Sequence, residues 1–163
     1  YAIPIEHYRI PKENVIDYNQ FKKSQHKKSS FKNVPKEWMI LSSKAPRLAH
    51  YKIKQNNESA DITITYFSGS VGNLLANINR WRNQLQLSPV QTPQSTPIQS
   101  SPYQIELVTI TENTSQHMVV AIITLPKGRY FVKCLGTPTI ISENIDILIN
   151  FVKEQPWLSF NHS

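Results

Sequence analysis

Residues 60–85, ADITITYFSGSVGNLLANINRWRNQL, contain the change of periodicity that decides the fold. Apolar and polar residues alternate over 61–67, which predicts a β-strand. After a Ser-Gly-Ser break, apolar residues recur at helical spacing from Val71 to Leu85. The stretch therefore predicts a strand followed by a helix of about four turns, with Ser70 as its N-cap.

The residues before this stretch predict two further strands. A short strand is expected at 39–41, after a turn fixed by Pro35. The alternation over 47–54 and the polar cluster 55–59 predict an antiparallel hairpin with the strand at 61–67.

The residues after it predict three more strands and a second helix. Strands are expected at 103–110, 116–125 and 129–135, and their short connections favour an antiparallel meander. Ser142 is expected to cap a terminal helix whose first turn holds Glu143 and Asp146, where the helix dipole favours acidic residues.

The expected order is therefore β-β-β-α-loop-β-β-β-α. Strands cluster on both sides of one helix without βαβ alternation, which predicts an α+β domain: a twisted antiparallel sheet covered by two main helices. This single domain is expected over residues 33–163. Its proline-rich stretch, 88–102, is uncharged and predicts an extended, disordered surface loop.

Composition excludes several classes of protein. The chain has 163 residues and 39% hydrophobic residues, enough for one domain with a real core. Its single cysteine excludes an internal disulfide and a multi-cysteine zinc site. The most apolar stretch, 118–125, is far shorter than the roughly 20 residues of a membrane-spanning helix.

The positive charge is concentrated in residues 1–32, a basic arm that also contains aromatic residues. These residues carry seven Lys or Arg and three acids, +4 of the chain's net charge of +7. Two interpretations remain open: a solvated tail, or an arm that becomes ordered against a partner or a membrane surface. In the second, the docking residues are expected to be Tyr8, Tyr18, Phe21, Lys22, Lys23, Lys27 and Lys28.

Residues 60–85 also resemble a family of exported bacterial proteins of unknown activity, whose members show a "GG-x-LANVNRWRGQLGL" helix after a strand ending in Phe-x-Gly. Residues 35–38, 47–51 and 130–136 match less specifically, so the likeness covers roughly 34–158. This chain departs from the motif at Asn73 and Asn83, where glycine is usual, and at Tyr130, where Trp is usual.

The order of strands and helices is similar to that of PsbP-like domains, the fold of an extrinsic photosystem II subunit. The family resemblance implies a lipoprotein or secreted protein on the periplasmic or extracytoplasmic face of a bacterial membrane. The first residue, Tyr1, is compatible with a mature chain after signal removal and equally with a trimmed one.

Asn77, Arg80, Trp81 and Arg82 form the best candidate binding site in the sequence. Two arginines beside an aromatic ring suit a carboxylate, a phosphate or a stacked base. However, Arg80 and Arg82 lie about 200° apart around a helix, so they cannot share one ligand unaided. The structural alternative is that one arginine ties the helix to a strand-end carbonyl or a carboxylate, and that Asn77 and Asn79 bind neighbouring loops.

The sequence shows no clear catalytic or metal-binding motif. The five histidines have no metal-ligand spacing, although His50 and His117 are expected on strands that could face each other. Cys134 is expected to be a buried small hydrophobe. We therefore predict no metal, no cofactor and no enzymatic activity.

Three functions remain. The first, which we favour, is a non-catalytic accessory or scaffold subunit that docks on the protein subunits of a larger membrane-associated complex. The second is a small-ligand or lipid-binding domain with a groove between sheet and helix, which a cavity lined by Tyr66, Trp81 and Phe131 would favour. The third, nucleic-acid binding through the basic arm, is disfavoured because residues 33–163 carry only +3.

Overall fold

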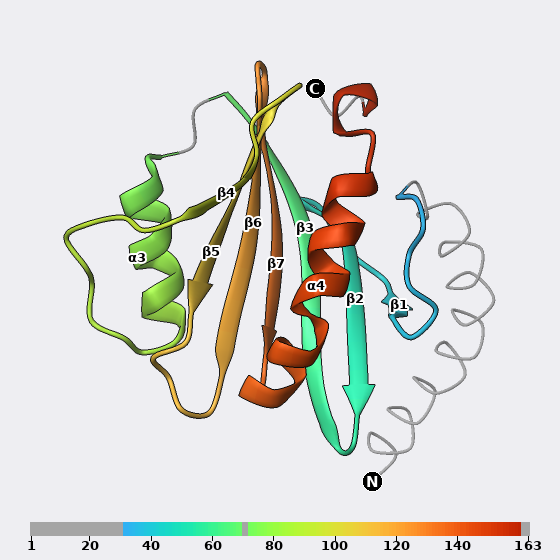
Figure 1. Cartoon of the computed structure of the whole chain (residues 1–163), viewed down its shortest axis with the longest axis vertical. Helices are drawn as coiled ribbons and strands as arrows, with labels where there is room; N and C mark the ends of the chain where they lie inside the picture. Colours follow the sequence, from blue (N-terminus) through green and yellow to red (C-terminus); the bar gives the residue numbers. More distant parts are fainter. Residues whose placement is uncertain (1–30, 70–71, 161–163) are drawn as a thin grey trace, which may run out of the picture. The chain divides into compact units, whose positions relative to one another are not determined.

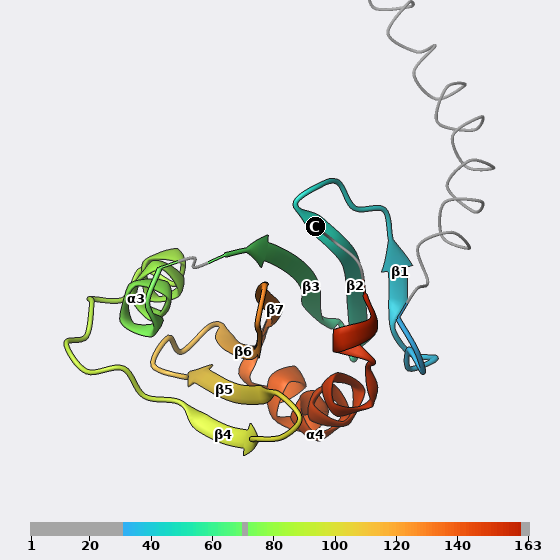
Figure 2. The same cartoon turned by 90° about the horizontal axis from the view of Figure 1, so that it is seen from above.

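A computed structural model describes residues 31–69 and 72–160. The chain divides into two units, residues 1–31 and 32–163. The second unit is built on a seven-stranded antiparallel sheet in the order β1-β2-β3-β7-β6-β5-β4. Helices α3 and α4 cover opposite faces of this sheet (Figure 1, Figure 2). The predicted α+β class, a sheet with two main helices, is confirmed.

The elements have the following bounds. The strands are β1 (Met39–Leu41), β2 (Arg47–Gln55), β3 (Glu58–Ser68), β4 (Thr96–Gln99), β5 (Gln104–Ile110), β6 (His117–Leu125) and β7 (Gly128–Gly136). The helices are α3 (Leu74–Gln84), α4 (Pro138–Glu154) and the short 3₁₀ helix η1 (Trp157–Ser159).

The predicted hairpin is formed by β2 and β3. Gln55 pairs with Glu58, which leaves Asn56 and Asn57 as a two-residue turn. Their φ angles are 51° and 66°, the left-handed conformation that a type I′ hairpin turn requires and that asparagine tolerates better than most residues. The turn fixes the register that puts Ile62 and Ile64 in the core.

The predicted meander of β5, β6 and β7 is also confirmed, and β7 joins it to β3 along nine residue pairs. The join is unusually close at its end, where Gly136 pairs with Ala60. A Cβ atom on Gly136 would lie 2.6 Å from the Cβ of Ala60 and 2.9 Å from Cγ2 of Ile140. Glycine is therefore required where the β-hairpin, the meander and α4 meet.

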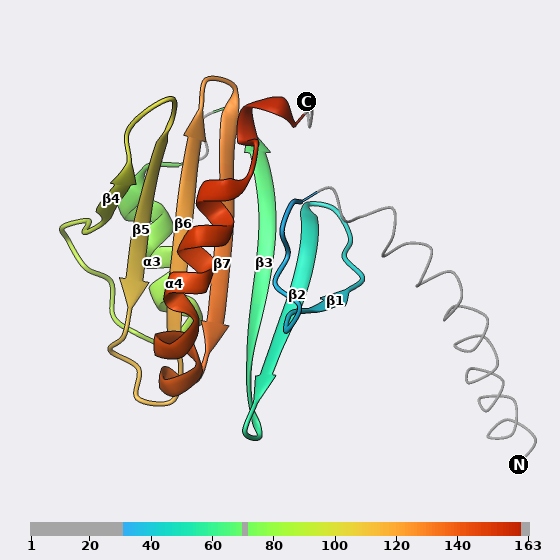
Figure 3. The ribbon, with the colours of Figure 1, turned by 45° about the vertical axis from the view of Figure 1, so that its right-hand side comes forward.

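Each face of the sheet is packed against one helix, with α4 in front of the sheet and α3 behind it in Figure 3. On one face, α4 packs over β3, β7 and β6, and Trp157 after it is fully buried against Tyr130, with ring centroids 4.7 Å apart. On the other face, Ile78, Trp81 and Leu85 of α3 join a cluster from β5, β6 and β7: Val108, Ile110, Met118, Val120, Ile122 and Phe131.

The start of α3 corrects the predicted N-cap. The helix begins at Leu74, and the side chain of Asn73 caps it by accepting a hydrogen bond from the backbone N–H of Ala76 at 2.7 Å. Ser70 lies outside the described residues. Periodicity identified the buried face of α3 but not its first residue, because the apolar pattern continues upstream of the cap.

The end of α3 is a Schellman motif. The N–H of Leu87 bonds to the carbonyl of Arg82 at 2.9 Å, and the N–H of Gln86 bonds to that of Asn83 at 3.0 Å. Gln86 adopts a φ of 59°, a position that glycine usually occupies.

The start of α4 also differs from the prediction. The helix begins one turn earlier, with Thr137 as N-cap and Pro138 in its first turn, and no acidic residue lies in that turn. Ser142 is inside the helix, where its hydroxyl donates to the carbonyl of Thr139. The helix starts earlier because the fixed φ of Pro138 suits the first turn of a helix as well as it suits a loop.

The proline-rich segment 88–102 contains a strand, so the prediction of a disordered loop is wrong. Residues Thr96–Gln99 form β4 and pair with β5 at the edge of the sheet. An edge strand tolerates Pro97 because its missing N–H need not face a neighbouring strand. The ladder shifts register between Pro97 and Gln99.

Residues 1–30 of the basic arm lie outside the described residues, and so do its candidate docking residues, Tyr8, Tyr18, Phe21, Lys22, Lys23, Lys27 and Lys28. Within residues 31–69 and 72–160, no helix is both long enough and apolar enough to cross a bilayer.

Gly136→Ala should destabilise the domain, because the added methyl group meets Ala60 and Ile140 inside the packed join. Overpacking of this kind costs about 1–3 kcal/mol of unfolding free energy, which urea denaturation measures. Gly136→Ala combined with Ala60→Gly should recover part of the loss. Equal stability of wild type and Gly136→Ala would contradict the close approach.

Gln86→Gly should stabilise the domain by about 0.5–1 kcal/mol, because glycine adopts positive φ without steric cost. Gln86→Ala is the matched control: it removes the same side chain but keeps the Cβ atom. If the alanine variant gains as much stability as the glycine variant, the backbone explanation fails.

Candidate functional site

The α3 side of strands β2, β3 and β7 carries polar side chains in adjacent cross-strand rows. Arg47, Thr65 and Phe131 form one row, because Thr65 pairs with Arg47 on one side and Phe131 on the other. Thr63 pairs with Lys133 in the next row. Paired residues of antiparallel strands project to the same face, so these side chains form a continuous floor.

Helix α3 forms a wall along this floor. Its C-terminal half supplies Arg80 and Gln84, which are four residues apart and therefore share one helix face. Trp81 lies between them in sequence and packs edge-to-face on Phe131, with ring centroids 5.4 Å apart. The guanidinium of Arg80 lies 5.9 Å from the centroid of the Trp81 ring.

Floor and wall enclose a hollow of about 130 Å³, which we call the cationic hollow. Its lining holds three cations from three different elements, Arg47 of β2, Arg80 of α3 and Lys133 of β7, and it includes no carboxylate. The other lining residues are Thr63, Thr65, Phe67, Trp81, Gln84 and Phe131.

Lys133 is the most constrained of the three cations. Its Nζ donates a hydrogen bond to Oε1 of Gln84 at 3.0 Å. Burial lowers the pKa of Lys133 below its ordinary value, and the charges of Arg47 and Arg80 lower it further. An anion in the hollow would relieve this mutual repulsion.

A nearby carboxylate, Asp61, does not neutralise the hollow. It lies on the same face of β3, two residues before Thr63, and its Oδ1 is 2.9 Å from Nε2 of His50 and 3.9 Å from Nζ of Lys52. Among the ion pairs of residues 31–69 and 72–160, none involves Arg47, Arg80 or Lys133.

A second depression of about 510 Å³ adjoins the hollow and shares Arg47 and Thr65 with it. Residues 42–46 form the rest of its lining, and they include Ser42, Ser43 and a fourth cation, Lys44. The hollow therefore continues into a wider depression of mixed polar and apolar lining.

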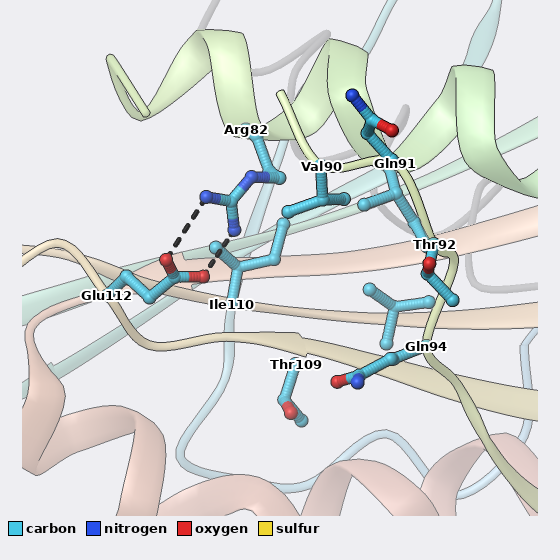
Figure 4. A pocket seen from close by; sticks show the side chains of 10 residues that line it. Arg82, Val90, Gln91, Thr92, Gln94, Thr109, Ile110 and Glu112 are labelled. Carbon is cyan, nitrogen blue, oxygen red and sulfur yellow. Dashed lines mark hydrogen bonds and ion pairs between the residues drawn. The ribbon is translucent and has the colours of Figure 1, made fainter. Parts of the chain in front are cut away.

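Arg82 lies on the opposite flank of α3. Its Nε donates to the carbonyl oxygen of Ser88 at 2.7 Å, and its guanidinium forms a two-bonded pair with the carboxylate of Glu112. Figure 4 shows this pair at one end of a pocket of about 360 Å³ between α3, the segment after it, and β5. The floor of that pocket is apolar, with Ile78, Val108 and Ile110.

The candidate residues from the sequence thus separate into two groups. Arg80 and Trp81 line the cationic hollow, whereas Arg82 lines the other pocket, so the two arginines serve different sites as their helical spacing indicated. The structural alternative for Arg82 is confirmed by its carbonyl and carboxylate partners. Asn77 is buried, and Asn79 binds the backbone of Val90 with both ends of its amide.

The cavity that would favour a ligand-binding domain, lined by Tyr66, Trp81 and Phe131, is found only in part. Trp81 and Phe131 line the hollow as expected, but Phe67 takes the place of Tyr66. Tyr66 packs instead on Tyr130, with ring centroids 4.8 Å apart, because neighbouring strand residues point to opposite faces.

The histidines and the cysteine have other roles. His50 on β2 and His117 on β6 do not face each other, since β3 and β7 lie between their strands. Cys134 is buried as predicted, and burial raises the pKa of its thiol to about 12. In the part of the chain that the structure describes, no three His, Cys, Asp or Glu residues are grouped as metal ligands.

Sequence reasoning missed Arg47, Lys133, Thr63 and Thr65, which complete the hollow. Each stands alone in a strand pattern, and only the pairing of β3 with both β2 and β7 brings them together. One signal in the sequence could have found them: polar residues recur at alternate positions of strands whose other face is predicted to be buried.

Comparisons with known proteins add no assignment. No protein-family model matches this chain, and no curated protein matches it significantly. The resemblance of residues 60–85 to exported bacterial proteins therefore stays a prediction.

The Arg82–Glu112 pair should make stability depend on pH. The bond from Arg82 lowers the pKa of Glu112 below its ordinary value of 4.5, so the carboxylate stabilises the fold at neutral pH. This contribution should disappear as the pH falls through the ordinary value and then the lowered one. Urea denaturation of wild type and Glu112→Gln should show a difference at pH 7 that shrinks in acid.

Glu143→Gln is the control for this measurement. It removes an exposed carboxylate of α4 that forms no ion pair with the other described residues. A wild type minus Glu112→Gln difference that stays constant into acid would contradict the assignment.

Proposed function

We propose that this domain is a binding protein for small anionic ligands, and that it holds the anionic group in the cationic hollow. One observation carries the proposal: Arg47, Arg80 and Lys133 converge on one hollow whose lining contains no carboxylate. Like charges held together without a counterion repel one another, so an anion that enters the cluster lowers its electrostatic free energy.

The surroundings of the hollow support a binding role over a structural one. Arg82, on the other flank of α3, shows how this fold anchors an arginine: with a carboxylate and a backbone carbonyl. Arg80 and Arg47 have no such carboxylate among the described residues. Their guanidinium groups therefore remain available for charge-assisted hydrogen bonds to a ligand.

The wider role predicted from the sequence remains a proposal of the same kind. In it, the protein is a non-catalytic accessory subunit of a membrane-associated complex, PsbP-like in architecture, lipoprotein-like, and located on the extracytoplasmic side. Its docking residues belong to the basic arm, outside the described residues. An anion-binding hollow fits an accessory protein that captures or senses a ligand for such a complex.

The proposal is tested by titrating the 163-residue chain with glucose, glucuronate and glucose 6-phosphate at fixed ionic strength. Isothermal titration calorimetry measures affinity, and NMR shifts of the Thr63, Thr65 and Lys133 amides locate the site. At least one of the two anions should bind, glucose should not, and added salt should weaken binding because the contacts are electrostatic.

Arg80→Gln should weaken anion binding about tenfold or more, the effect expected when a charged hydrogen-bonding group is lost. Lys54→Gln removes an exposed cation seven residues along the chain from Arg47 and should leave affinity unchanged. If neither anion binds, or if both variants behave alike, the hollow is not an anion site.

A further inference from the structure

The three cations of the hollow come from both of its sides, two from the floor and one from the helix. Arg47 comes from the start of β2, Lys133 from β7 and Arg80 from the helix above the sheet. A carboxylate offers two oxygens in one plane, whereas a phosphate monoester offers three terminal oxygens arranged around phosphorus. Donors on two sides of a site that do not share one plane match the tetrahedral group better than the planar one.

Charge favours a dianion for the same reason. Three cations around a monoanion leave two charges uncompensated, and around a dianion they leave one. Trp81 in the wall of the hollow and Phe131 in its floor are both almost fully buried, at 2% and 4% exposure. These rings keep water from one side of the site, which strengthens each charge interaction there.

The cationic hollow is too small for a large ligand, but the adjoining depression could hold the part of the ligand that lies outside the hollow. The depression over residues 42–46 shares Arg47 and Thr65 with the hollow and is also lined by Ser42, Ser43 and Lys44. Ser42, Lys44 and Thr65 offer this open depression hydrogen-bonding groups that a hydroxylated body could use.

We propose that the hollow binds the phosphate group of a soluble phosphate monoester whose hydroxylated body lies over residues 42–46, as in a sugar phosphate. This inference rests on the proposed anion-binding function and narrows its ligand class. Thr63 and Thr65 donate their hydroxyls to the phosphate oxygens from the floor, and Arg47 contacts both the phosphate and the body.

The test compares four probes on the full chain by calorimetry: glucose 6-phosphate, glucuronate, inorganic phosphate and glucose. Glucose 6-phosphate should bind about tenfold or more tightly than glucuronate, because it brings one more charge and one more oxygen. It should also bind about fivefold more tightly than inorganic phosphate, because the sugar adds contacts over residues 42–46.

Three outcomes separate this inference from the broader function. If glucuronate binds as tightly as glucose 6-phosphate, the phosphate preference is overturned while anion binding stands. If inorganic phosphate matches glucose 6-phosphate, the role of the neighbouring depression is overturned. If no anion binds, the proposed function fails and this inference with it.

Two variants test where the phosphate and the hydroxylated body of the ligand bind. Lys133→Gln should weaken glucose 6-phosphate and inorganic phosphate alike, by about tenfold, whereas Lys44→Gln should weaken only glucose 6-phosphate. Lys54→Gln is the matched control, and circular dichroism shows whether each variant is folded. Equal losses from Lys44→Gln and Lys133→Gln with inorganic phosphate would contradict the division.

A phosphate monoester also occurs in a lipid headgroup, so a further arm uses vesicles. Co-sedimentation with phosphatidylcholine vesicles is compared with and without phosphatidic acid. Absence of hollow-dependent sedimentation supports a soluble ligand. Sedimentation that requires phosphatidic acid and is lost in Lys133→Gln would overturn the soluble source in favour of the headgroup.

Discussion

The pairing of β3 with β7 is the constraint on which the rest of this structure depends. It joins an N-terminal hairpin to a C-terminal meander whose last strand lies about 60 residues further along the chain, and it turns two small sheets into one of seven strands. It places the floor of the hollow. Thr63 and Thr65 lie on β3, Lys133 and Phe131 lie on β7, and Arg47 reaches the site only because β2 is paired to β3.

Helix α3 is the second determinant of the site, and it is held firmly by the segments around it. Asn79 binds the backbone of Val90, and Arg82 binds Ser88 and Glu112. The wall that carries Arg80 is thus fixed by contacts that do not involve the hollow. A wall fixed in this way would preorganise the hollow for the proposed ligand.

The sequence predicted six of the seven strands and both helices, because alternation and helical spacing follow directly from which faces are buried. It failed at boundaries decided by single side chains: Asn73 rather than Ser70 caps α3, and Pro138 rather than Ser142 opens α4. It also missed β4, since prolines are rare in strands except at edges.

The site was only half predictable for a related reason. Arg80 and Trp81 stand out in a local motif, but Arg47, Thr63 and Lys133 acquire meaning only from strand pairing. The spacing of Arg80 and Arg82 correctly separated them, because helix geometry is local. The three cations of the hollow are 33, 53 and 86 positions apart along the chain, and no single window of sequence contains their convergence.

The anchoring of α3 by Arg82 has a consequence for how occupancy could be communicated. Because α3 is anchored by Arg82 and the strands are paired along their length, we expect little conformational change when a ligand binds. A bound anion would instead change the electrostatic potential at the protein surface, because it would offset the positive charges of Arg47, Arg80 and Lys133. A partner protein that distinguishes the free from the ligand-bound form would therefore have to sense the change in electrostatic potential, because the shape of the domain would stay nearly constant.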